Sequence, residues 1–170
     1  TERGLVAAAE GELTFHNPML RDVIAAALAD TDEGRRLHRT CAALLLGPAG
    51  PRGHAAAARR ADHLIAAGEL RDAAESLRDA ARGYRSATDF AHALRLLDEH
   101  DGLLDALAAD DYDRRRAEAN LIRADVLGLQ WEFGQAAAAA QRALTPATRL
   151  GWPGLRAEAL AMLSHVCRQR

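Results

Sequence analysis

The sequence contains no lysine, and this absence excludes several kinds of chemistry. All 22 of its basic residues are arginine. The phosphate-binding loop of P-loop NTPases, the protein-kinase fold and Schiff-base catalysis each depend on a lysine amine. None of them can therefore occur in this chain in its usual form. We attribute the arginine preference to the coding bias of a GC-rich genome rather than to phosphate binding.

Aromatic residues and cysteines are also scarce. Aromatic residues make up 4% of the chain, although 49% of it is hydrophobic, with alanine supplying much of that share. An alanine-rich core requires helices that approach one another closely, so we expect many thin helical layers. The two cysteines, Cys41 and Cys167, lie far apart within helical patterns. They are interpreted as buried thiols in a reducing compartment, not as a disulfide framework.

Long apolar runs and a concentrated basic face are missing as well. No apolar run approaches the roughly 20 residues of a membrane span, and the start lacks the pattern of a signal peptide. The net charge is -2, with acidic and basic residues interspersed. A nucleic-acid interface needs its basic residues gathered on one face. We expect a cytoplasmic chain with no direct contact to membranes or nucleic acid.

The N-terminal part has a different pattern from the rest. Leu13 and Phe15 alternate with polar residues, which favours a short N-terminal β-hairpin. Asn17 is a suitable cap, and Pro18 suits the first position of a helix. A second helix is expected over 33–46, with a cap at Asp32 and inward-facing Leu37, Cys41, Leu44 and Leu45.

A glycine- and proline-rich segment over 47–53 separates two predicted regions, 1–48 and 53–170. Helices are expected after it over 54–67, 71–84, 89–104 with a possible break at Gly102, 111–129, 133–144 and 153–170. Pro146 is expected to end the helix over 133–144.

Two of these helices share a pattern at a fixed step. Ala73 and Ala93 are 20 residues apart, and so are Leu77 and Leu97. A small residue lets two crossing helices approach, and a larger one a turn later fills the gap. Repetition of this kind predicts an all-α, antiparallel helical-hairpin solenoid.

Two stretches carry a family likeness. Residues 68–81 and 128–144 resemble the second half of a tetratricopeptide motif, with a loop, an aromatic or leucine, an alanine and then a closing pair such as Ala143-Leu144. The likeness extends over about 53–170, and it implies tetratricopeptide-like repeats that bind proteins or peptides.

Residues 15–24 and 34–39 resemble the end of the winged helix in large signal-transduction (STAND) ATPases, in particular the MalT-like regulators that carry a LuxR-type DNA-binding domain. In these regulators a wing strand and a His-Pro step precede a hydrophobic helix and a Leu-His-Arg helix. Here Asn17 separates His16 from Pro18. The resemblance covers about 1–46 and implies nucleotide binding upstream and DNA reading downstream.

Possible metal sites lack a full set of ligands. His38 and Cys41 are three residues apart, but a structural zinc site needs about four ligands, and no second pair at metal spacing exists. The acidic stretch 98–113 lacks the ligand and glycine spacing of an EF-hand. We expect it to be a solvated loop in which Asp110 or Asp111 caps a helix, with an acidic partner-binding patch as the alternative.

Catalytic residues are not expected, because the serines lie outside any Gly-x-Ser-x-Gly setting. No cofactor is expected either. Tyr84, Trp131 and Trp152 lie near helix ends, where they pack between hairpins or contact a partner or effector.

The last helix carries an apolar stripe made of Leu155, Ala159, Met162, Leu163 and Val166. We expect it to be left exposed, as in an unfinished repeat of a longer protein. It would then support weak homodimer formation through Leu155, Met162 and Val166, or else it packs back on 133–144.

The function expected from these features is that of a non-catalytic regulatory or scaffolding arm of a signal-transduction ATPase or LuxR-type regulator. The arm would contact a protein partner, a small-molecule effector or the ATPase core of the same parent chain. The alternative is a free-standing adaptor that binds a peptide in its groove.

Overall fold

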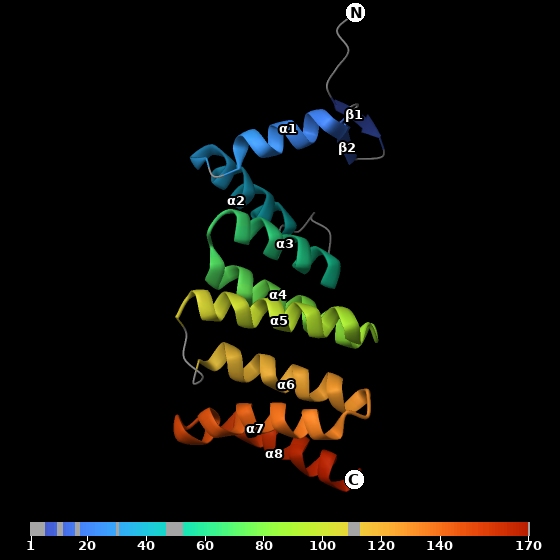
Figure 1. The fold of residues 1–170 in the computed structure, drawn as a ribbon, viewed down its shortest axis with the longest axis vertical. Coiled ribbons are helices and arrows are strands. Elements are labelled where there is room, and N and C mark those ends of the chain that lie inside the picture. Colours follow the sequence, from blue (N-terminus) through green and yellow to red (C-terminus); the bar gives the residue numbers. More distant parts are fainter. Residues whose placement is uncertain are drawn as a thin grey trace, which may run out of the picture.

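The computed structural model describes residues 6–9, 12–15, 18–29, 31–46, 53–108 and 113–169. Within these residues eight helices follow a two-stranded hairpin (Figure 1). The helices are α1 (Pro18–Leu28), α2 (Asp32–Leu46), α3 (His54–Ala66), α4 (Leu70–Ser86), α5 (Phe90–Ala106), α6 (Arg114–Leu129), α7 (Phe133–Arg149) and α8 (Pro153–Arg168). The coarse prediction of an all-helical, solenoid-like array is confirmed.

The hairpin consists of β1 (Val6–Ala9) and β2 (Glu12–Phe15), which run antiparallel with Val6 opposite Phe15. The side chains of both strands lie outside the described residues, and so does the predicted cap Asn17. The interpretation of this segment as the remnant of a winged helix therefore stays a prediction. Most of the predicted boundary at 47–53 also lies outside the described residues.

From α3 onward each helix packs antiparallel against the next, as the ribbon in Figure 1 shows. Among the described residues, α4 also touches α6 and α6 touches α8, whereas α3, α5 and α7 do not touch one another. Helices that touch lie on the tighter side of a curved array. The inner side is therefore formed by α4, α6 and α8, and the outer side by α3, α5 and α7.

Alanine fills the places where helices cross. Ala73 and Ala93 have no exposed surface, and the same is true of Ala136 and Ala140 in α7. These positions have the spacing predicted for close approach. A methyl group at each crossing lets the backbones come together, and leucines such as Leu77 fill the space one turn away.

One kind of turn recurs between the packed helices. Thr88 adopts a positive φ of 60°, its amide donates to the Arg85 carbonyl, and the Asp89 amide donates to the Tyr84 carbonyl. This pair of bonds is a Schellman motif, which reverses the chain after a helix. The positive-φ positions in the other turns are Gly68, Ala108, Trp131 and Gly151. A shared turn between helices of similar length produces the regular step seen in the sequence.

Several predicted helix ends differ from the structure. Helix α7 continues through Pro146 to Arg149. The loss of one backbone donor is tolerated there because Pro146 is buried and the neighbouring Ala147 is fully covered by the array. Helix α5 passes through Gly102 without a break.

Two helix caps also differ from those predicted. Helix α2 is capped by Thr31 rather than Asp32, because the Gly34 amide donates to the Thr31 hydroxyl at 3.0 Å. Helix α6 is capped by Asp113, which accepts from the Arg115 amide at 2.7 Å. The predicted caps Asp110 and Asp111 lie outside the described residues.

The apolar face predicted for α2 is wrong in part. Leu37 and Leu44 are exposed, the latter to 67%, whereas Ala42 is buried against α3 and α4. The small side chain of Ala42 suits the close crossing with α3. The prediction of two buried thiols is also wrong, because Cys41 is half-buried and Cys167 is exposed.

Candidate partner-binding groove

A groove of about 890 Å³ lies between α4, α6 and α8 on the inner side of the array. Its apolar lining comes from Leu121, Ile122, Leu155 and Met162. Its charged lining consists of Arg82, Arg85, Arg114, Glu118, Asp125, Glu158 and His165. The groove therefore combines an apolar base with charged groups of both signs.

The C-terminal stripe helps to form this groove instead of remaining exposed. Leu155, Ala159 and Val166 are buried, with Val166 only 1% exposed, and Met162 is half-buried. They pack against α6 and α7. The prediction that this stripe is left exposed is therefore wrong, and of the two expected outcomes the structure has the stripe packed back on the preceding hairpin. Self-association through Leu155, Met162 and Val166 stays a prediction.

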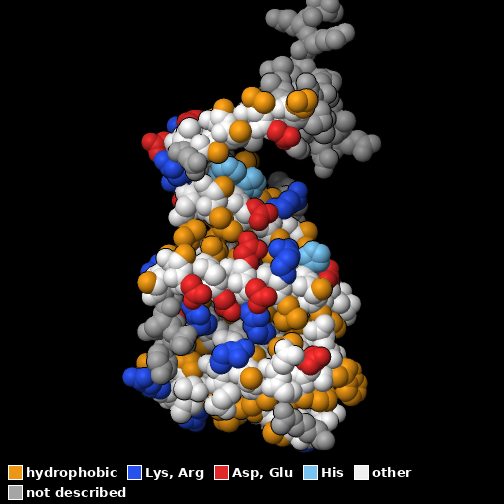
Figure 2. All heavy atoms as spheres, in the orientation of Figure 1, with side chains coloured by type: hydrophobic (Ala, Val, Ile, Leu, Met, Phe, Trp, Pro, Cys, Tyr) orange, Lys and Arg blue, Asp and Glu red, His pale blue; other side chains and the backbone are white. Residues whose placement is uncertain are grey.

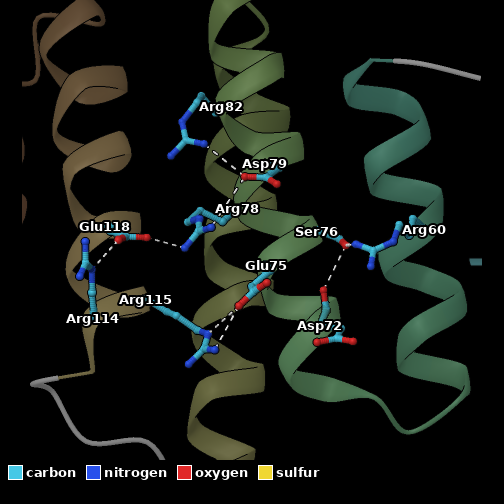
Figure 3. Close-up of polar contacts among 10 residues, drawn as sticks. All are labelled: Arg60, Asp72, Glu75, Ser76, Arg78, Asp79, Arg82, Arg114, Arg115 and Glu118. Atoms are coloured by element: carbon cyan, nitrogen blue, oxygen red, sulfur yellow. Dashed lines mark hydrogen bonds and ion pairs between the residues drawn. The ribbon is translucent and has the colours of Figure 1, made fainter. Parts of the chain in front are cut away.

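The wall between α4 and α6 is held by ion pairs. Figure 3 shows Glu118 placed between two arginines: its carboxylate accepts from Arg114 at 3.0 Å and from Arg78 at 2.5 Å. Nearby, Arg115 donates to Glu75 at 3.0 Å. Arg114 and Glu118 line the groove, and the pairs Arg78–Glu118 and Glu75–Arg115 tie α4 to α6.

A different set of ion pairs lies on the outer side. Figure 2 shows acidic side chains facing basic ones across the middle of this face. Arg123 reaches Asp98 at 2.6 Å and Asp101 at 2.8 Å, and Arg116 reaches Asp105 at 2.8 Å. The predicted acidic loop is therefore in part a set of arginine partners on α5.

Asp101 has an altered acidity. Burial alone would raise its pKa, but the hydrogen bond with His100 and the positive charges of Arg123, His100 and Arg116 lower it overall. The Asp101 carboxylate is thus held charged between the two helices. His100 itself is fully buried, and within the part of the chain that the structure describes its Nε2 has no hydrogen-bond partner.

The described histidines do not assemble a metal site. His38 lies against His63, with the two Nδ1 atoms 2.9 Å apart. Among the described residues, no three His, Cys, Asp or Glu side chains come together as ligands of a metal ion. His38 and Cys41 therefore have the setting of helix-packing residues.

The three predicted contact residues have three different settings. Tyr84 is half-buried between the rings of His54 and His92, so it packs between hairpins. Trp152 packs against the cluster formed by α6, α7 and α8. Trp131 is 76% exposed, and its ring centroid lies 5.7 Å from that of Phe133 in an edge-on arrangement. None of the three lines the groove.

Of the residues that line the groove, the sequence singled out Leu155 and Met162, but as a self-association surface, and it did not single out those of α4 and α6. Ile122 and Met162 become neighbours only because every second helix lies on the inner side of the array. The alternation of helices between the inner and the outer side leaves only a weak pattern in the sequence when the repeats are degenerate.

No protein-family model, curated protein or solved structure matches the chain. Among the described helices, none combines the length and the apolar character needed to cross a bilayer.

Proposed function

We propose that this chain is a non-catalytic regulatory or scaffolding arm that binds a segment of a protein partner in the groove between α4, α6 and α8. The observation that supports this function is the groove itself, in which an apolar base is bordered by charged side chains. Tetratricopeptide-like repeats, to which the sequence bears a likeness, would present such a surface.

The chemistry of the groove suits an amphipathic segment. Apolar side chains of the partner would cover Leu121, Ile122 and Met162, and this burial would supply most of the affinity. Charged side chains of the partner would meet Arg82 and Glu158, which would fix its orientation. Arg82 is exposed, and among the described residues its ion pair is with Asp79 on its own helix, a contact that a partner can replace at little cost.

A designed pair of α8 variants tests this function. Ala161 lines the groove and is exposed, whereas Ala157 is exposed on the same helix but lies outside the groove. A 12-residue peptide would first be selected from a random display library against the wild-type chain. Its Kd would then be measured by calorimetry for wild type, Ala161→Arg and Ala157→Arg.

The arginine at 161 is expected to fill the groove and weaken binding at least tenfold. The same change at 157 should leave the Kd within about twofold of the wild-type value, because it adds the same charge and side-chain length outside the groove. Equal affinity of the two variants, or no peptide of micromolar affinity from the library, would refute the groove as the binding site.

A specific observation favours the parent protein being a signal-transduction ATPase. Among the described residues, helices α1 and α2 expose Val23, Leu37, Leu44 and Leu46, and α3 packs against α2 but not against α1. Exposed apolar side chains gathered in one region are typical of a surface covered by another domain. We propose that they dock on the ATPase core of the same parent chain, as the winged-helix likeness implies. A parent reading frame without an upstream phosphate-binding loop would exclude this assignment.

A further inference from the structure

The apolar core of the array is divided at the junction between α5 and α6. Buried clusters on one side draw on α2, α3, α4 and α5, and those on the other side draw on α6, α7 and α8. In the described part of the chain, three side chains cross this division: Ala119 of α6 is buried in the first group, Ile122 of α6 packs against that group, and Leu94 of α5 packs against a cluster of the second group. Helix α5 also touches α6 much less than it touches α4. The array therefore consists of two well-packed blocks, α3–α5 and α6–α8, with a thin apolar contact between them.

Ion pairs occupy this junction instead. Among the described residues, three join α4 to α6 and three join α5 to α6. On the inner side they are Glu75–Arg115, Arg78–Glu118 and Arg85–Asp125, and on the outer side they are Asp98–Arg123, Asp101–Arg123 and Asp105–Arg116. We call this set the seam. The middle of Figure 2 shows its outer half, and Figure 3 shows part of its inner half.

The ion pairs of the seam can persist while the two blocks move relative to each other. The Arg123 guanidinium is covered, with 14% of the side chain exposed, but its partner Asp98 is 70% exposed. A long arginine side chain can follow such a carboxylate through several ångströms. Attraction between partly exposed charges is weakened by salt, whereas contacts between alanines are not. The seam should therefore loosen under conditions that leave both blocks intact.

The groove crosses this seam. Arg82 and Arg85 of α4 belong to one block, and the remaining lining residues belong to α6 and α8 in the other. We infer that the α5–α6 junction is a hinge held closed by the seam, and that a segment bound in the groove holds the two blocks together. The second part rests on the proposed function. A ligand that contacts both blocks favours the closed arrangement by the difference in its affinity for the two states.

The hinge can be followed with one label on each block. Cys167 is exposed on α8, and Arg71 is exposed on α4. In a Cys41→Ser, Arg71→Cys background, spin labels at 71 and 167 report the distance between blocks by pulsed electron resonance. We expect a narrow distance distribution at low salt and a broader one in 1 M NaCl, with unchanged helical circular dichroism.

Charge variants separate the seam from general salt effects. Glu75→Gln, Asp98→Asn, Asp105→Asn removes three seam carboxylates and should give the broad distribution already at low salt. The control Glu33→Gln, Asp79→Asn, Glu99→Gln removes the same charge from pairs within single helices and should keep it narrow. A distribution unaffected by both salt and the seam variant would overturn the hinge, as would equal effects of the two triple variants.

The coupling between peptide binding and the hinge is tested separately. A peptide selected for the groove should narrow the distribution in 1 M NaCl. A peptide that binds there without narrowing it would overturn the coupling between groove and hinge. If no peptide binds, the proposed function fails, whereas the salt and variant results still decide the hinge.

Discussion

At the scale of single residues, Trp131 combines an unfavourable backbone with an exposed side chain. Its φ is 65°, in a turn position where the α3–α4 and α7–α8 turns carry Gly68 and Gly151. A residue with a Cβ is strained in this backbone conformation. The packing of the exposed indole offsets little of that strain.

Trp131→Gly is therefore expected to stabilise the chain by about 0.5–1 kcal/mol, measured by urea denaturation. Gly151→Ala, at φ 69°, should destabilise it by a similar amount. A loss of stability in Trp131→Gly would mean that the contact of the indole with Phe133 outweighs the backbone strain. If the glycine variant is stable but binds a selected partner less well, Trp131 is a recognition residue, as the sequence suggested.

The His38–His63 contact predicts acid sensitivity at the α2–α3 crossing. Burial is the main cause that lowers the pKa of His63, followed by the charge of His38. Asp62 raises this pKa, and Arg59 lowers it. Because the folded-state pKa lies below the ordinary value of 6.5, an open or unfolded chain takes up the proton first. Stability is thus complete above about pH 6.5 and declines as the pH falls through that value towards the folded-state pKa.

Hydrogen exchange of α2 amides should accordingly become faster, relative to α7, between pH 7 and pH 5 after correction for the intrinsic rate. The Arg39–Glu69 pair also ties α2 to the array. His63→Asn should remove the pH dependence, and His165→Asn, on the exposed side of α8, should keep it. Identical profiles for the two variants would contradict the assignment.

At the scale of helices, stability depends on how closely they cross. Ala73 has no exposed surface and lies against Ala42 and Leu64. Ala73→Leu should therefore overpack the crossing and cost about 1–3 kcal/mol, measured as a shift in the denaturation midpoint. Ala157→Leu, on an exposed face, should cost less than about 0.5 kcal/mol. Equal effects would mean that Ala73 does not occupy a close crossing.

The sequence predicts these elements where local rules and packing agree. Ala73 and Ala93 could be predicted to lie at helix crossings, because a small residue that recurs at a fixed spacing has few explanations other than close packing. Pro146 could not, since the local rule for proline is overridden by the burial of Ala147 and its neighbours in the array. Thr31 and Asp32 are both good caps, and only the backbone geometry selects between them.

At the scale of the whole molecule, the features that matter for function are made by residues far apart in sequence. Met162 and Ile122 both line the groove because of the curvature of the array, and Asp98 of α5 pairs with Arg123 of α6. No local pattern encodes such pairs when the repeats are degenerate. The sequence therefore predicts a helical repeat, and the structure supplies the location of the candidate binding surface.

The central claim is that the groove between α4, α6 and α8 receives the partner. It is tested most directly by amide chemical-shift mapping with a selected 12-residue peptide on the isotope-labelled chain. The account predicts that the largest perturbations fall on residues lining the groove, such as Ile122, Ala161 and Met162, with the outer face of α5 and α7 unaffected. Perturbations centred on Trp131 and Phe133, or on the outer side around Arg142, would contradict it.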